Sequence, residues 1–178
     1  MNFINKNKML FLKNLKLDIF PLSLIFVLTF SRLIPHPPNF TPIIAVAVMS
    51  GYLFKNIYVS AAVLLLSMFI SDLLIGVYSN FFFVYFSLLL IMFFCTKISK
   101  NLNFKKLLIL SFISALVFFL ITNFGVWVFS SMYEKNFNGL LYCYFLAIPF
   151  FTNTVISTIV FSCLAYAVNN FYYKKSYN

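Results

Sequence analysis

Acidic residues are almost absent from this chain of 178 residues, which has only three Asp and Glu against 13 Lys and Arg. Charged residues of both signs make up 9% of the chain, whereas a soluble domain carries about 25%. The chain therefore lacks the side chains needed to cover a core with a water-exposed surface. Because 63% of its residues are hydrophobic, we predict an integral membrane protein whose main partner is the lipid bilayer.

Cysteine and histidine are also scarce. Cys95, Cys143 and Cys163 form no CxxC pair, which argues against a disulfide framework or a cysteine metal site. His36 is the only histidine, and zinc needs three or four ligands, so no metal is expected. No Gly-rich phosphate loop and no nucleophile–base spacing is present. We therefore expect neither an enzyme nor a bound cofactor.

Six apolar runs are present: residues 17–33, 42–54, 57–77, 81–96, 106–130 and 141–169. A spanning helix needs about 17–25 such residues. The run at 42–54 is short, so it either reaches half-depth or belongs to a tilted helix packed within protein. Pro149 predicts a kink or a tilt in the last run. The predicted fold is an all-α bundle of six transmembrane helices.

The lysines predict the orientation of this bundle. With the N-terminus inside, eleven cations fall on the inner side, and only Arg32 and Lys135 fall outside. This asymmetry predicts that both termini lie on the inner, cytoplasmic side of the membrane. The same lysines account for the net charge of +10 without a nucleic-acid partner. The predicted organisation is a basic segment (1–16), one membrane domain (17–170) and a cytoplasmic tail (171–178).

Apart from Asp18, the second residue of the first run, Asp72 is the only acidic residue within an expected span, and it lies near the outer end of that span. A carboxylate at such a depth is costly and is often functional. Three interpretations stay open: contact with a ligand, a structural ion pair with Arg32, or a carboxylate that is protonated or reaches the surface.

Further polar and aromatic residues gather at the same outer level. Asn123 and Trp127 are four residues apart and share a helix face. Trp127 either anchors its helix at the membrane interface or stacks on a ligand, and Asn123 either joins helices or contacts the ligand. Asn153 follows Pro149 by four residues. Proline leaves the backbone carbonyl one turn before it without a helical hydrogen bond. This carbonyl either lines a cavity or belongs to a simple packed kink. Tyr142 is expected to stack on a ligand.

The first outer loop reads PHPPNFTP and is unusually stiff, because proline restricts both itself and the residue before it. His36 and Asn39 within it are candidate ligand contacts. The loop is either a lid over the outer pocket or a rigid connector. Thr41 is expected to cap the next helix, with Pro42 at its first position. The candidate lid residues are Pro35, Pro37, Pro38 and Thr41.

Ala47 and Gly51 have the small-xxx-small spacing that lets membrane helices approach closely. We predict that they pack the second helix against a neighbour.

With these motifs in hand, the chain resembles a bacterial six-helix membrane family of unassigned activity that is described as transport proteins. The resemblance rests on RLIPHPPNFTPIIAVAVMSGYLF, SDLLIG, TNFGVW and GLLYCYFLAIPFFTNT. That family in turn is similar to the S components of energy-coupling factor (ECF) transporters. This similarity implies capture of a vitamin- or nucleobase-like molecule from outside, with an ECF-type membrane subunit and ATPases as partners.

Two functions are therefore carried forward. The first is a binding and transport protein whose ligand enters between the first, third, fifth and sixth helices. Arg32 or His36 would meet an acceptor or anionic group, and Asp72 would meet a donor or amine. The second is a structural or assembly scaffold of the membrane, in which the outer cluster serves only packing or a partner.

Overall fold

The computed structural model describes residues 20–54, 56–99 and 102–176, and every regular element in these ranges is a helix. The predicted all-α class is confirmed. In chain order the elements are a first helix (Phe20–Leu33), α2 (Ile43–Val48), α3 (Ser50–Leu53), α4 (Ile57–Ile75), α5 (Phe81–Ile98), α6 (Phe104–Phe129), α7 (Phe137–Leu146) and α8 (Ile148–Ser176). The expected basic segment at 1–16 lies outside the described residues, and α8 continues into the expected tail as far as Ser176.

Four helices are long and apolar enough to cross a membrane. These are α4, α5, α6 and residues 148–171 of α8, with mean hydropathies between 1.6 and 2.4. At about 1.5 Å per residue, 18 or more residues approach the roughly 30 Å of a bilayer's hydrocarbon core. Large apolar side chains such as Leu73, Phe82 and Phe145 are more than half exposed on the outside of the bundle. The chain is thus a multi-pass membrane protein.

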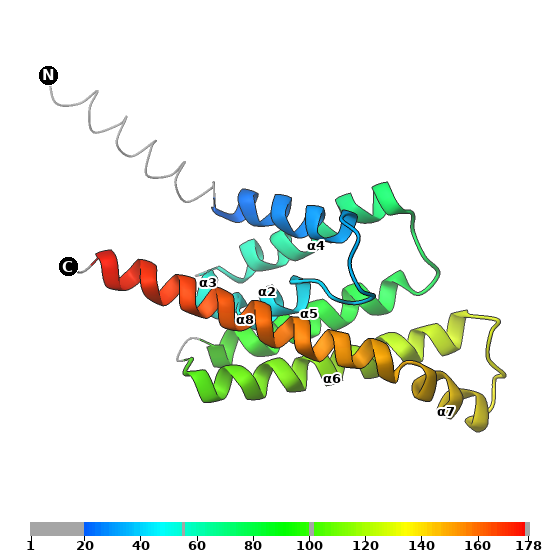
Figure 1. Cartoon of the computed structure of the whole chain (residues 1–178). Coiled ribbons are helices and arrows are strands. Elements are labelled where there is room, and N and C mark those ends of the chain that lie inside the picture. The colour runs from blue at the N-terminus through cyan, green and yellow to red at the C-terminus, as the bar shows by residue number, and fades with distance from the viewer. Residues whose placement is uncertain (1–19, 55, 100–101, 177–178) are drawn as a thin grey trace, which may run out of the picture.

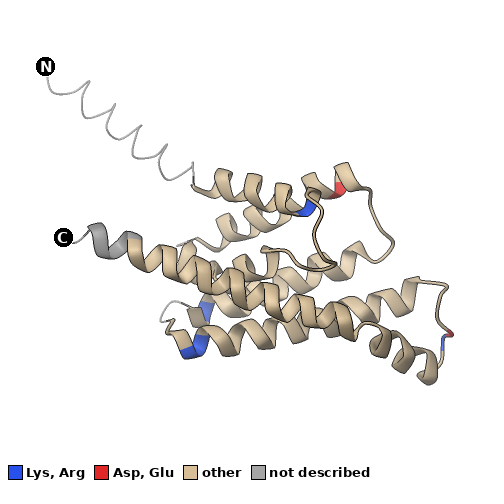
Figure 2. Ribbon diagram, in the orientation of Figure 1, with Lys and Arg blue, Asp and Glu red and all other residues tan. Residues whose placement is uncertain are grey.

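When α2–α3 and α7–α8 are each taken as one segment, successive segments run in alternating directions, so the first helix begins at the same end of the molecule as α8 finishes (Figure 1). Charge is unevenly divided between the two ends (Figure 2). Lys97, Lys105 and Lys106 flank the turn between α5 and α6 at the first of these ends. At the opposite end lie Arg32, Asp72 and the Glu134–Lys135 turn. Lys55 and Lys100 lie outside the described residues.

The short run at 42–54 folds as two consecutive helices, α2 and α3, that meet at Met49. Together they cover about 11 residues, which is about 16 Å, or half the hydrocarbon thickness. All six residues of α2 are buried, because the longer helices surround it. The expected start was wrong by one residue: Pro42 is the N-cap, and Thr41 makes no capping bond.

The predicted kink near Pro149 is present as a break between α7 and α8 at Ala147. Proline has no N–H to continue the hydrogen bonds of α7, and helical bonding resumes from Phe151 N–H to Ala147 O at 3.0 Å. The break sets α7 beside the end of α6 that lies away from Lys105 and Lys106, where both helices line the site described next.

Candidate functional site

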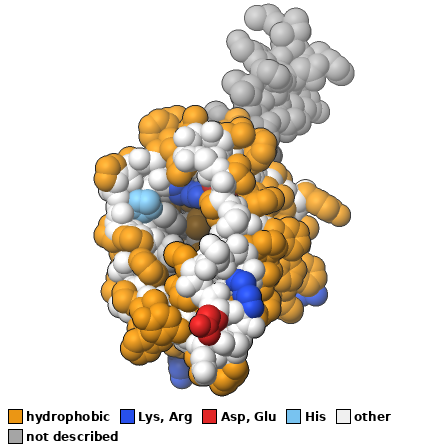
Figure 3. All heavy atoms as spheres, turned by 90° about the vertical axis from the view of Figure 1, so that its right-hand side faces the viewer, with side chains coloured by type: hydrophobic (Ala, Val, Ile, Leu, Met, Phe, Trp, Pro, Cys, Tyr) orange, Lys and Arg blue, Asp and Glu red, His pale blue; other side chains and the backbone are white. Residues whose placement is uncertain are grey.

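A cavity of about 780 Å³ opens at the end of the bundle that carries Arg32. Figure 3 shows this end of the molecule, where the surface is hollowed. Its apolar lining includes Met68, Val84, Phe118, Val126 and Phe150. Its polar lining is formed by Arg32, His36, Asn39, Thr41, Tyr78, Asn80, Thr122, Asn123 and Tyr133. Among the described residues, Arg32 is the only Lys, Arg, Asp or Glu in this lining.

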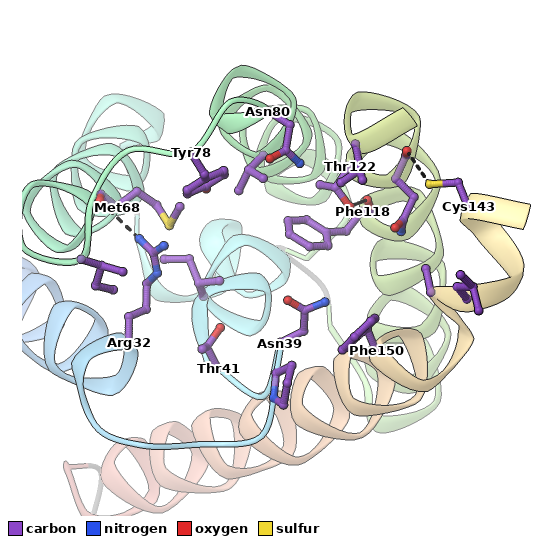
Figure 4. A pocket seen from close by; sticks show the side chains of 18 of the residues that line it. Arg32, Asn39, Thr41, Met68, Tyr78, Asn80, Phe118, Thr122, Cys143 and Phe150 are labelled. Atoms are coloured by element: carbon purple, nitrogen blue, oxygen red, sulfur yellow. Dashed lines mark hydrogen bonds between the residues drawn. The ribbon is translucent and has the colours of Figure 1, made fainter. Parts of the chain in front are cut away.

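Arg32 is held against α4 through one nitrogen. Its Nη1 lies 2.7 Å from Asp72 Oδ1, donates to Met68 O at 3.3 Å, and donates to Ser71 Oγ. Figure 4 shows the side chain reaching from the first helix across the edge of the cavity. Apart from Tyr78, which lies beside the guanidinium, no described residue accepts a hydrogen bond from Nη2 or Nε. One edge of Arg32 therefore stays available to the cavity.

Asp72 lies behind Arg32 and does not line the cavity. It is 3% exposed, and its second oxygen, Oδ2, accepts a hydrogen bond from the Tyr85 hydroxyl at 2.8 Å. Of the three interpretations of this residue, the ion pair with Arg32 is the arrangement found. Asp72 was predicted to contact a ligand, but it is absent from the cavity lining. The pair neutralises the arginine, because each charge lies within contact distance of the other.

Apart from His36, the rest of the polar lining consists of amide, hydroxyl and phenol side chains. Figure 4 shows Asn39 and Asn80 pointing into the cavity from opposite sides, and neither amide side chain bonds to any described residue. Burial raises the pKa of Tyr78 to about 12, helped by the Asp72 charge and opposed by Arg32. Burial also raises the pKa of Tyr133. Both phenols therefore stay protonated and neutral at physiological pH.

Asn123 lines the cavity as predicted, but part of its amide is already used. Its Nδ2 donates to Phe119 O in its own helix at 2.8 Å. The neighbouring Thr122 hydroxyl donates to Phe118 O at 2.8 Å. The Asn123 carbonyl oxygen, Oδ1, accepts no hydrogen bond from the described residues. This side chain therefore offers an acceptor to the cavity.

The first outer loop forms a fixed wall of the cavity. Phe40 N–H bonds to Pro37 O at 2.9 Å, and Asn39 has a φ of 63°, as in a type II turn with Pro38 at the second position. Asn153 Nδ2 donates to Pro38 O at 3.1 Å. The Ser157 hydroxyl donates to Asn39 O at 3.3 Å.

These contacts correct two predicted roles. Asn153, predicted to contact a ligand, is outside the cavity lining and instead holds the loop on α8. Of the candidate lid residues, Pro38 and Thr41 line the cavity, whereas Pro35 and Pro37 do not.

Replacing both Asn153 and Ser157 with alanine is expected to release this wall. Each hydrogen bond contributes about 1 kcal/mol, so the double variant should unfold at a lower temperature, and amide hydrogen exchange should rise at residues 39–41. Thr152→Ala on the same helix is the control, because its hydroxyl bonds only to Ile148 O of α8. Unchanged exchange in the double variant would contradict the pinning role.

Trp127 and Tyr142 also lie outside the cavity lining. Trp127 Nε1 donates to Glu134 O at 2.9 Å, and the Lys135 ammonium lies 5.7 Å from the centre of the indole ring. Trp127 therefore orders the turn between α6 and α7. Tyr142 is 59% exposed and packs edge-on against Tyr133. Both residues were predicted to stack on a ligand, and neither side chain is placed to do so in this cavity.

Sequence reasoning missed several residues that line the cavity. Tyr78 and Asn80 come from the short segment between α4 and α5, and Met68, Phe118 and Phe150 come from helices. The polar YSN triplet between two apolar runs was the available signal for the first two. The three apolar residues have no such signal in the sequence, because a Met or Phe that lines a cavity cannot be distinguished from the other apolar residues of a transmembrane helix.

Ala47 and Gly51 are packing residues. Ala47 is 0% exposed, and Gly51 packs so closely on α5 that an added Cβ would lie 2.3 Å from Thr96 O.

No group of three or more His, Cys, Asp or Glu suitable for a metal occurs within the residues that the structure covers.

Comparison with known proteins gives a family and no close relative. No curated protein matches the chain, and no solved structure matches it. One family model matches residues 13–178, nearly the whole chain, so the matched range includes every residue that lines the cavity. The chain belongs to the Family of unknown function (DUF6580).

Proposed function

We propose that this protein captures a small molecule at the outer face of a bacterial cytoplasmic membrane and serves its uptake. The observation that carries the proposal is the cavity. Its volume of about 780 Å³ falls within the range of about 300–1,000 Å³ for small-molecule sites. Such sites combine apolar and aromatic side chains with converging polar groups, and the lining of this cavity contains both kinds.

The outward orientation follows from the distribution of charge. Lys97, Lys105 and Lys106 gather at the end away from the cavity, and cytoplasmic loops carry an excess of lysine and arginine. In this arrangement the six helical passes would comprise the first helix, the half-depth α2–α3 pair, α4, α5, α6 and the broken α7–α8. The cavity then faces the outside.

The bundle is closed beneath the cavity, which supports a requirement for a partner. Thr41 and Ile43, at the start of α2, line the cavity, and the rest of α2 continues into the buried core towards the lysine-rich end. A ligand cannot pass this core without movement of the helices. The chain has no phosphate loop of its own, so the proposal assigns the energy to a partner, in the manner of ECF transporters.

A tryptophan in the cavity tests the proposal. Val126→Trp fills part of the space and is expected to reduce ligand binding and uptake at least about tenfold. Val128→Trp is the matched control, because Val128 lies on the same helix, is 37% exposed and does not line the cavity. Binding is measured as thermal stabilisation of purified protein by molecules identified in native mass spectra.

Two outcomes would overturn the proposal. One is equal binding or uptake by the two tryptophan variants. The other is purified wild-type protein that carries no small molecule, gains no stability from any, and always retains the same protein partner. That second result would establish the scaffold function instead.

A further inference from the structure

We infer that the cavity selects an uncharged molecule: one with an acceptor, such as a carbonyl or ring nitrogen, for Arg32, and a flat apolar part for Phe118 and Phe150. The inference rests on the proposed function and specifies its ligand class. It is built from the ion pair, the unused hydrogen-bonding groups and the absence of a second charge in the described lining.

The first step concerns charge. Arg32 Nη1 and Asp72 Oδ1 are 2.7 Å apart, and Asp72 is 3% exposed. An anionic ligand at Arg32 would therefore also meet the field of a buried carboxylate directly behind it, and a cationic ligand would meet the guanidinium first. The Coulomb energies of the two charges largely cancel for either ligand, while each charged ligand would still lose its hydration.

The second step concerns the neighbouring charges at this end of the molecule. Glu134 accepts a hydrogen bond from Asn136 Nδ2 at 2.7 Å. Lys135 is occupied by the carbonyls of Trp127 and Ser130. Neither Glu134 nor Lys135 lines the cavity. No other described Lys, Arg, Asp or Glu compensates a charged ligand inside it.

The third step concerns the groups that remain to bind. Arg32 offers those donors of Nη2 and Nε that the neighbouring Tyr78 does not take up. Asn39 and Asn80 offer both donors and acceptors, and Asn123 offers its Oδ1. Asn39 is exposed and Arg32, Asn80 and Asn123 are half-buried, so a ligand that fills the cavity would cover all four from water. Polar groups covered in this way need partners, so a ligand that binds tightly must supply several hydrogen-bonding atoms without a charge. Phe118 and Phe150 supply aromatic faces for the apolar part of such a molecule.

The test uses the ultrafiltered small-molecule fraction of bacterial cells, separated by ion exchange into neutral, anionic and cationic pools. Each pool is mixed with the purified full chain at mildly alkaline pH, above the usual titration range of histidine. Thermal stabilisation is measured, and the retained compounds are identified by mass spectrometry. The neutral pool is expected to stabilise the protein most.

The Asp72→Asn variant sharpens the test, because asparagine keeps the shape of the side chain and removes its charge. Arg32 then becomes an uncompensated cation beside the cavity. The ratio of neutral to anionic compounds retained is expected to fall at least about tenfold, since one charge a few ångströms away exceeds the free energy of one tenfold step. Glu134→Gln also removes an acid at this end, and it is expected to leave the ratio unchanged.

The outcomes separate the inference from the proposed function. If the anionic or the cationic pool stabilises wild-type protein most, the inference is wrong although a ligand site exists. If Asp72→Asn folds and the ratio does not change, the inference is wrong as well. If no pool stabilises wild-type protein, the proposed function fails together with the inference. The wild-type arm decides the result even if the Asp72→Asn variant cannot be purified.

Discussion

Arg32→Ala is expected to lower the free energy of unfolding by about 3–5 kcal/mol, because it leaves a buried carboxylate without its cation. Asp72 is 3% exposed, and the Tyr85 hydroxyl is the only other side chain among the described residues that contacts its carboxylate within hydrogen-bond distance. The same change removes the donors that face the cavity, so ligand stabilisation should disappear. Thermal unfolding in detergent, with and without ligand, measures both effects.

The double variant Arg32→Ala/Asp72→Asn separates these two roles. The double variant has no unpaired Asp72 carboxylate, so its free energy of unfolding is expected to be higher than that of Arg32→Ala. The double variant still lacks the guanidinium and should not bind ligand. Such non-additivity is typical of residues in direct contact. If the single and double variants unfold at the same temperature, the ion pair does not carry the stability assigned to it.

Gly51→Ala is expected to destabilise the protein by roughly 1–3 kcal/mol, because the site is already fully packed. An added Cβ would lie 2.3 Å from Thr96 O and 2.8 Å from Thr96 Cα. Both are backbone atoms and cannot rotate away, so α3 must separate from α5. This movement would also weaken the hydrogen bond between the Ser50 and Thr96 hydroxyls, which is 3.0 Å long.

Val27→Ile is the control for this substitution. It also adds one carbon, but Val27 is 53% exposed on the outside of the first helix, so its expected effect on thermal unfolding is small. A Gly51→Ala variant with the melting temperature of wild type would show that α3 and α5 are not in contact at this point.

Much of the helical plan could be predicted from hydropathy and proline. The runs at 57–77, 81–96 and 106–130 correspond to α4, α5 and α6 with shifts of a few residues at their ends. Apolar length specifies such helices because backbone groups in a bilayer must bond within the helix. The interruption at Met49 could not be predicted in this way, since it depends on how α2 and α3 pack between longer helices.

The candidate site was predicted only in part. Arg32, His36, Asn39 and Asn123 were expected at the cavity and line it. Trp127, Tyr142 and Asn153 were expected there too, but they bond or pack elsewhere. Depth in the membrane was available from sequence position, whereas the direction of a side chain around its helix depends on which neighbours it meets.

The amino-acid sequence by itself therefore determined the membrane class, the apolar helices and the clustering of rare polar residues towards one end. These properties follow from local composition and the hydrogen-bonding needs of a chain in lipid. Only the tertiary structure decided that Asp72 neutralises Arg32, that Asn153 secures the first loop, and that Asn39 and Asn80 face each other across a cavity. Those roles depend on contacts between residues about 40 to 115 positions apart, and hydropathy and spacing do not specify such contacts.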